Sequence, residues 1–153
     1  MNDKIKILVI DDDPEIRCTL EAVLSAEGYW VETVETGTDA IRKTEEKCYN
    51  IALIDINLPD INGIQLLTKL KDGSPRMRKI IVTGYPTLPN AVDAVNKQAN
   101  AYLIKPVDLP VMLETIKEQL GQQESENNFT ETKIGEFIQN RARAFLESKK
   151  GTS

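Results

Sequence analysis

The chain has 153 residues, of which 19 are Lys or Arg, 24 are Asp or Glu and none is His, so its net charge is −5. This length and composition predict a soluble globular domain with a hydrophobic core, and the acidic balance argues against direct binding to nucleic acid. The absence of histidine excludes His-based catalytic triads, histidine general bases and the usual zinc enzymes.

Short apolar runs alternate with helical patterns five times along the chain. Strict alternation of this kind predicts a parallel sheet that is covered by helices on both faces. The expected strands are residues 5–10, 29–34, 51–54, 79–83 and 101–104, and the expected helices are residues 14–27, 38–47, 63–71, 89–98 and 109–120.

The strands at 5–10 and 51–54 are nearly continuous apolar runs, which is typical of strands buried on both faces. The helix between the first two strands has clear boundary signals. Asp13 can cap it, Pro14 suits its first position and Gly28 favours its end.

The composition changes after residue 120, where the predicted domain 1–120 ends. Residues 121–129 are polar and predict a linker. Residues 130–153 predict a helical extension that docks on the domain, pairs with another chain or stays partly disordered. Burial of apolar surface is worth about 25 cal/mol per Å², which favours an ordered helix. The apolar face of this extension comprises Ile134, Phe137, Ile138, Ala142, Phe145 and Leu146.

Three acidic residues are expected to meet at one edge of the sheet. Asp11 and Asp12 follow the first strand directly, and Asp55 follows the third. Two like charges 4 Å apart repel by about 4 kcal/mol at an effective dielectric constant near 20. The sequence therefore predicts a cation at this edge, and Mg²⁺ prefers such oxygen ligands.

Thr83 ends the fourth strand and Lys105 follows the fifth, so both are expected at the same edge. A cation, an ammonium group and a hydroxyl around a carboxylate would stabilise a phosphoryl group that arrives in line at Asp55. The motifs at the four strand ends are Ile10-Asp11-Asp12-Asp13-Pro14, residues 54–63, Val82-Thr83-Gly84 and Tyr102-Leu103-Ile104-Lys105-Pro106.

These motifs, in this order, resemble the response regulator receiver domain of two-component signalling, over about residues 4–120. The resemblance implies a doubly wound α/β fold with a flavodoxin-like strand order, 2-1-3-4-5, and five helices. It also implies that Asp55 is the phosphoacceptor and a Mg²⁺ ligand. Asp12 would bind Mg²⁺ directly, Asp11 mostly through water, and Asn57 through its main-chain carbonyl.

The resemblance further implies that Lys105 pairs with Asp55 or its phosphoryl group and that the Lys105–Pro106 peptide is cis. Thr83 would hydrogen-bond the phosphoryl group, and Tyr102 would swing inward behind it. A tyrosine in an edge strand is commonly a packing residue, but the switch role is favoured here. Gly63 is interpreted as a residue that shapes the loop before the third helix.

The predicted function is therefore that of a regulatory protein which accepts a phosphoryl group from a sensor histidine kinase and signals to an unknown downstream protein. Catalysis is expected only for its own phosphorylation and dephosphorylation. Residues 121–153 are too few for the DNA-binding output domain that many relatives carry, so no direct nucleic-acid contact is expected, and a homodimer is left open. No apolar run is long enough to span a bilayer and no signal peptide is recognised, which predicts a cytoplasmic protein without membrane contact.

Three alternatives compete with this interpretation. A haloacid dehalogenase-like phosphatase would use Asp11 and Asp13, but that family expects Thr or Val where this chain has Glu15, and Asp55 would be unexplained. A flavodoxin would need backbone donors and hydroxyls after the first strand, where this chain has acids. A receiver-like domain that docks without phosphorylation would not need the complete set of site residues.

Overall fold

The computed structural model describes residues 4–73 and 75–150. Its five strands form one parallel sheet in the order β2-β1-β3-β4-β5, so the predicted doubly wound fold is confirmed. In the part of the chain that the structure describes, no helix combines the length and the apolar character that a bilayer crossing needs. The strands are β1 (Lys6–Ile10), β2 (Trp30–Val34), β3 (Ile51–Asp55), β4 (Arg78–Thr83) and β5 (Ala101–Ile104).

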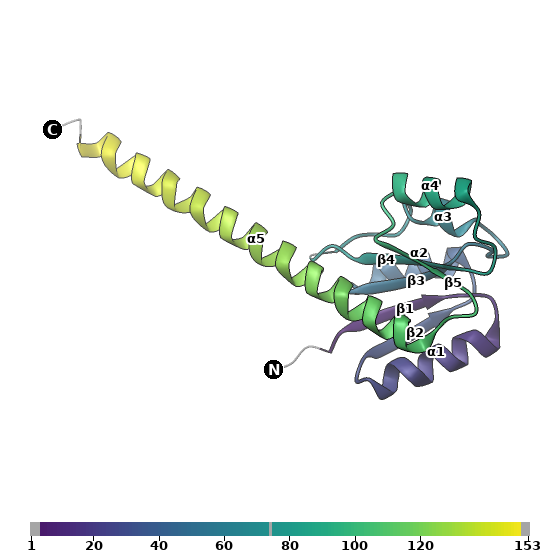
Figure 1. Cartoon of the computed structure of the whole chain (residues 1–153). Helices are drawn as coiled ribbons and strands as arrows, with labels where there is room; N and C mark the ends of the chain where they lie inside the picture. Colours follow the sequence, from purple (N-terminus) through teal and green to yellow (C-terminus); the bar gives the residue numbers. More distant parts are fainter. Residues whose placement is uncertain (1–3, 74, 151–153) are drawn as a thin grey trace.

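Helices cover both faces of the sheet (Figure 1). One buried cluster joins the sheet to α1 and α5, through residues such as Leu20 and Ile116. The other joins the opposite face to α2, α3 and α4, through residues such as Ala40, Ile64 and Ala94. The helices are α1 (Pro14–Ala26), α2 (Gly37–Glu46), α3 (Gly63–Leu66), α4 (Leu88–Asn96) and α5 (Leu109–Lys150).

The central strands bring two chain segments to the same level at one edge of the sheet. Ile10 of β1 is in register with Ile54 of β3, so Asp11 and Asp55 come next on neighbouring strands. Both strands are almost entirely buried between the two helix layers, as their continuous apolar runs predicted. The sheet itself therefore places the acidic residues together.

The local signals around the first helix are confirmed. The Asp13 side chain accepts a hydrogen bond from the Glu15 amide at 2.9 Å, and Pro14 occupies the first helical position. Gly28 follows the helix with φ of 94°, a left-handed conformation that favours glycine.

The third helix is shorter than predicted, since α3 ends at Leu66 and not near residue 71. The Leu67 amide bonds to the Ile64 carbonyl and the Lys69 amide to the Leu66 carbonyl, three residues back in each case. This tighter pattern ends the regular α-helix while Leu67 and Leu70 stay buried. The apolar periodicity that predicted a longer helix reflects burial in irregular turns.

The predicted linker at 121–129 is wrong, because α5 continues through it as one helix. The polar residues of this stretch contact the amino-terminal edge of the sheet. The buried Gln123 side chain donates hydrogen bonds to the carbonyls of Asn50 at 3.0 Å and Arg76 at 2.8 Å, and accepts one from the Asn50 amide group at 3.1 Å. The division of the chain into domain and extension stays a prediction.

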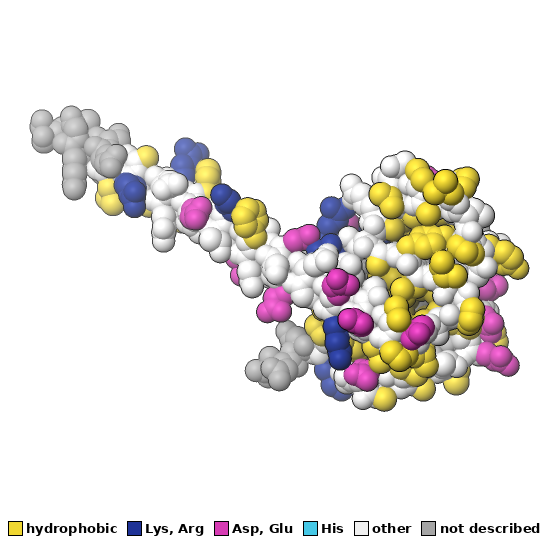
Figure 2. Space-filling view, viewed as in Figure 1, with side chains coloured by type: hydrophobic (Ala, Val, Ile, Leu, Met, Phe, Trp, Pro, Cys, Tyr) yellow, Lys and Arg dark blue, Asp and Glu magenta, His cyan; other side chains and the backbone are white. Residues whose placement is uncertain are grey.

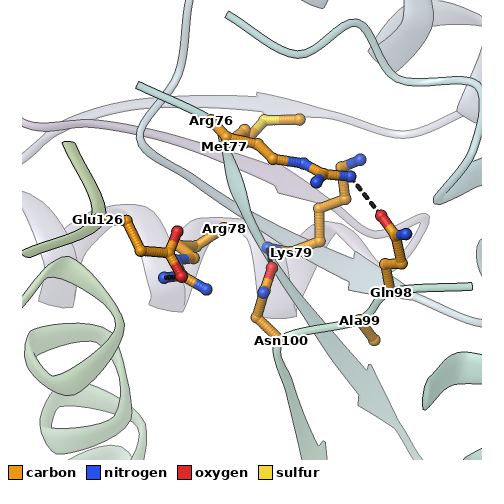
Figure 3. A pocket seen from close by; sticks show the side chains of 8 residues that line it. All are labelled: Arg76, Met77, Arg78, Lys79, Gln98, Ala99, Asn100 and Glu126. Carbon is orange, nitrogen blue, oxygen red and sulfur yellow. Dashed lines mark hydrogen bonds and ion pairs between the residues drawn. The ribbon is translucent and has the colours of Figure 1, made fainter. Parts of the chain in front are cut away.

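An ion pair lies next to these hydrogen bonds. The Arg78 guanidinium is 2.6 Å from the Glu126 carboxylate, beside a polar hollow of about 240 Å³ (Figure 3). We call the contacts of Gln123 and Glu126 with Asn50, Arg76 and Arg78 the amino-edge anchor. It fixes α5 at the edge of the sheet opposite the acidic residues.

Beyond the anchor, α5 projects away from the domain (Figure 1). The extension is helical. Ile134, Phe137 and Ile138 are 54%, 61% and 60% exposed, so it does not fold back on the domain. Ala142 and Leu146 are also exposed, and the Phe145 side chain lies outside what the structure describes.

Candidate functional site

The three predicted acidic residues converge at the carboxyl-terminal edge of the sheet. One carboxylate oxygen from each of Asp11, Asp12 and Asp55 lies within 4.8 Å of the others. Asp11 and Asp55 are only 3% and 6% exposed, whereas Asp12 faces solvent. A buried acidic pair with an exposed third acid leaves an open side through which a small ligand can approach.

Backbone and side-chain donors position Asp11. Its carboxylate accepts a hydrogen bond from the Asp13 amide at 3.0 Å. Arg17 of α1 donates to the Asp11 carbonyl at 2.8 Å. The sequence pattern did not single out Arg17, which is six residues from Asp11 and thus outside the three- and four-residue spacings that bring helical side chains together.

Lys105 lies between the two buried carboxylates. Its Nζ is 2.8 Å from Asp11 Oδ2 and 3.5 Å from Asp55 Oδ2. The Lys105 amide donates to the Thr83 carbonyl at 2.7 Å, and the Lys105–Pro106 peptide is cis, as expected. The loop after β5 thus holds an ammonium group at the acidic cluster.

The charges of the cluster are not balanced. Burial raises the pKa of Asp55, and the neighbouring Asp11 charge raises it further, although Lys105 and the Asn57 amide oppose both effects. Burial alone would lower the pKa of Lys105, but its hydrogen bond to Asp11 and the charges of Asp11 and Asp55 raise it overall. Three carboxylates face one ammonium group, so the site favours an added cation.

Thr83 and Tyr102 lie on β4 and β5. The Thr83 side chain is fully buried, and its hydroxyl accepts a hydrogen bond from the Tyr85 amide at 3.0 Å. The Tyr102 ring packs against the core, and its buried hydroxyl has no hydrogen-bond partner among residues 4–73 and 75–150. Burial raises the pKa of this hydroxyl.

Asn57 begins the loop after β3. Its amide donates to Asp55 Oδ1 at 3.4 Å, and it forms an isolated antiparallel bridge with Asn62. The bridge closes the loop on itself next to the acidic cluster. The metal-ligand role of the Asn57 carbonyl stays a prediction.

The family model described as the response regulator receiver domain matches residues 7–117. The chain belongs to this family. ZraR of Klebsiella oxytoca, a transcriptional regulatory protein, is 35% identical over 136 residues, which are 88% of this chain and 31% of ZraR. The chain therefore spans less than a third of the length of this curated relative.

Two crystal structures are similar to this receiver domain. One is the CheY-like response regulator receiver domain protein of Methanospirillum hungatei JF-1, with 44% identity, a TM-score of 0.78 and coverage of 81% of this chain and 99% of that one. The other is a response regulator of Burkholderia pseudomallei with a phosphorylated aspartic acid, a calcium ion and citrate. It has 29% identity, a TM-score of 0.70 and coverage of 81% of this chain and 72% of that one.

Asp60 is, like Arg17, a positioning residue of the receiver domain that the sequence pattern did not reveal. Asp60, in the loop after β3, accepts hydrogen bonds from the Gly37 amide at 2.9 Å, the Thr38 amide at 2.8 Å and the Thr38 hydroxyl at 2.6 Å. These bonds lower the pKa of Asp60 to about 2. They tie the loop that follows Asp55 to the start of α2, where the helix dipole favours an anion.

We expect Asp60→Asn to destabilise the receiver domain at neutral pH. Because the folded-state pKa is lowered from near 4 to about 2, the ionised group contributes stability that is fully present above pH 4 and is lost as the pH falls toward 2. The difference in urea midpoint between wild type and variant should therefore narrow below about pH 4. The exposed Asp93, replaced by Asn, is the control; a pH-independent difference at Asp60 would contradict this prediction.

Proposed function

We propose that this chain is a phosphorylation-controlled switch that accepts a phosphoryl group on Asp55 from a sensor histidine kinase. The observation that carries the proposal is the Lys105 ammonium group lying within 3.5 Å of Asp55 inside a cluster of three carboxylates. Two simpler roles do not account for the whole cluster. A structural salt bridge would need only one carboxylate beside Lys105, and a helix cap would need no ammonium group. A phosphoryl acceptor needs a carboxylate nucleophile, a cation and a fixed positive donor together.

Mg²⁺ fits the residues present. Asp11, Asp12 and Asp55 offer only carboxylate oxygens, which a hard divalent cation prefers, and the main-chain carbonyl of Asn57 would add a fourth oxygen. Burial raises the pKa of Asp55 most and the neighbouring Asp11 charge raises it further, and an added cation would offset this second effect. When bound, Mg²⁺ neutralises charge on the phosphoryl oxygens. The phosphorylated aspartic acid and calcium ion of the Burkholderia relative support the same assignment.

In the proposed reaction, an Asp55 carboxylate oxygen attacks the phosphorus atom of a phosphohistidine on the kinase. An O–P bond forms, the N–P bond breaks, and its electron pair stays on the histidine nitrogen. Lys105 stabilises the charge on the transferred group. The Thr83 hydroxyl accepts a hydrogen bond from the Tyr85 amide, so its own proton remains available to donate to a phosphoryl oxygen.

The switch would involve Thr83 and Tyr102. If Thr83 moves toward the phosphoryl group, it leaves the Tyr85 amide, and the loop between β4 and α4 changes its conformation. Tyr102 is suited to follow this change because its buried hydroxyl forms no competing hydrogen bond among the described residues. The coupled movement would alter the surface formed by α4, β5 and α5.

That surface supports a protein partner as the receiver of the signal. Apolar side chains are exposed around α4 and β5 (Figure 2). A cluster of this kind marks a protein-binding surface more often than a solvated one. Its members are Tyr85, Leu88, Val92, Val95 and Ile104.

Wild-type protein incubated with Mg²⁺ and acetyl phosphate should gain the mass of one phosphoryl group, with the modification on Asp55. Removal of Mg²⁺ by EDTA should prevent the gain, and Asp55→Asn should abolish it, while Asp93→Asn behaves as wild type. No gain by the wild type, or an equal gain by Asp55→Asn, would overturn the proposal. Turnover of p-nitrophenyl phosphate that needs Asp11 but not Asp55 would instead support the phosphatase alternative.

A further inference from the structure

The exposed apolar residues of the projecting helix lie on the same face of α5 that packs against the domain. Ile134 follows the buried Ile116, and Ile138 follows Leu120, after five turns of 3.6 residues each. Phe137 follows the buried Gln119 at the same interval. One continuous face is thus buried in its first half and exposed in its second.

The amino-edge anchor marks the boundary between these halves. Gln123 and Glu126 still contact the sheet, whereas the side chains of residues 128–144 are exposed except for Gly135. Within the part of the chain that the structure describes, the domain ends where the exposed apolar face begins. We call the exposed set Ile134, Phe137 and Ile138 the distal stripe.

The sequence of the projecting segment does not support an isolated helix in water. Thr130, Thr132 and Asn140 are weak helix formers, and Gly135 costs about 1 kcal/mol relative to Ala. Most helices of this kind derive their stability from packing of an apolar face. The distal stripe therefore needs a partner surface to keep this segment helical.

We propose that the partner is the distal stripe of a second copy of this chain, in antiparallel orientation. In a parallel pair, each domain would lie on the stripe side of its own helix, and both domains would compete for the space between the two helices. In an antiparallel pair, the domains lie at opposite ends of the assembly. The stripes then meet without contact between the domains.

The charges along the projecting helix favour the same orientation. Glu131 lies beside the distal stripe before its centre and Arg141 lies in line with it after its centre, whereas Glu136 and Arg143 lie on the opposite side of the helix. A parallel pair places each group beside its own copy, where like charges repel. An antiparallel pair centred on the distal stripe brings Glu131 of each copy toward Arg141 of the other, which is attractive and also selects the orientation.

Oligomeric state tests the pairing. The wild-type chain should be a dimer by sedimentation equilibrium, without beryllofluoride or Mg²⁺, and Ile138→Glu should raise the dissociation constant at least about tenfold. Phe129→Glu is the matched control, because Phe129 is 64% exposed on the opposite face of the same helix. An NMR spectrum that retains the dispersed signals of the folded domain shows that each variant is folded. A monomeric wild type, or a dimer that Ile138→Glu leaves unchanged, would overturn the proposal.

The orientation is tested by a distance. A spin label at Gln122→Cys, in a background where the exposed Cys18 and Cys48 are replaced by Ser, lies near the root of the projecting helix. Antiparallel pairing places the two labels about 45 Å apart at 1.5 Å per residue. Parallel pairing places them within about 25 Å, because paired helices lie 8–10 Å apart and the label arms add the remainder. A double electron–electron resonance distance in the shorter range would overturn the antiparallel arrangement.

Discussion

We expect Lys105→Met to slow phosphorylation by acetyl phosphate about 100-fold, which is the usual cost of losing one preorganised donor to a charged transition state. The same variant should bind Mg²⁺ at least as tightly as the wild type. The reason is that Lys105 lies 2.8 Å from Asp11 and 3.5 Å from Asp55, so its loss leaves these carboxylates with a larger uncompensated negative charge. The phosphorylation rate should therefore fall, whereas the affinity for Mg²⁺ should rise or stay unchanged.

Two measurements separate these effects. Intact mass as a function of time gives the phosphorylation rate, and calorimetric titration gives the Mg²⁺ affinity. Lys117→Met, at an exposed position on α5, is the control for the loss of a lysine. Equal rates for Lys105→Met and wild type, or a Mg²⁺ affinity that falls in parallel with the rate, would contradict the role of Lys105 as a donor to the phosphoryl group.

Gly63→Ala should destabilise the receiver domain by about 3 kcal/mol, at the upper end of ordinary overpacking. Gly63 begins α3 directly beneath the end of β3. A Cβ atom there would overlap the Asp55 carbonyl oxygen and lie 2.8 Å from the Asp55 carbonyl carbon and 2.9 Å from the Ile56 Cα. These are backbone atoms, so relief requires movement of the strand end that carries the proposed phosphoacceptor.

The control is the same substitution where space is open. A Cβ atom at Gly121 in α5 has no neighbour within 4 Å, so Gly121→Ala should stabilise the helix by up to about 1 kcal/mol. Urea unfolding of both variants gives the two changes in free energy. Gly63→Ala should also phosphorylate more slowly, because a displacement of about 1 Å at a reacting group can cost a factor near 100. If Gly63→Ala had the same free energy of unfolding as the wild type, the prediction would be wrong, because the loop would have accommodated the Cβ atom without loss of stability.

The strands and the acidic cluster were predictable from the sequence because a parallel sheet relates them by simple geometry. Continuous apolar runs mark strands buried on both faces, and an acid at the end of each run must appear at one sheet edge. The proximity of Asp11, Asp12 and Asp55 could therefore be predicted without knowledge of any tertiary contact. The roles of Thr83, Tyr102 and Asn57 came from the family resemblance and not from this geometry.

The wrong linker at 121–129 and the missed role of Asp60 arose where polar side chains take part in tertiary contacts. Gln123 and Glu126 looked like linker residues because their composition is polar, yet they bind carbonyls and a guanidinium at the sheet edge. Asp60 was part of the motif at 54–63 but had no role of its own there, although it binds the start of α2. Local composition cannot report a partner that lies tens of residues away in the chain.

The amino-edge anchor fixes one end of the projecting helix, so a small tilt at that end produces a larger displacement at the other. Its root is fixed to the amino ends of β3 and β4, the same strands whose other ends carry Asp55 and Thr83. From residue 127 to residue 150 the helix is about 36 Å long, so a tilt of about 5° at the root would move its far end by about 3 Å. A change in the strands too small to alter any contact within the domain would become a displacement of atomic size at the tip.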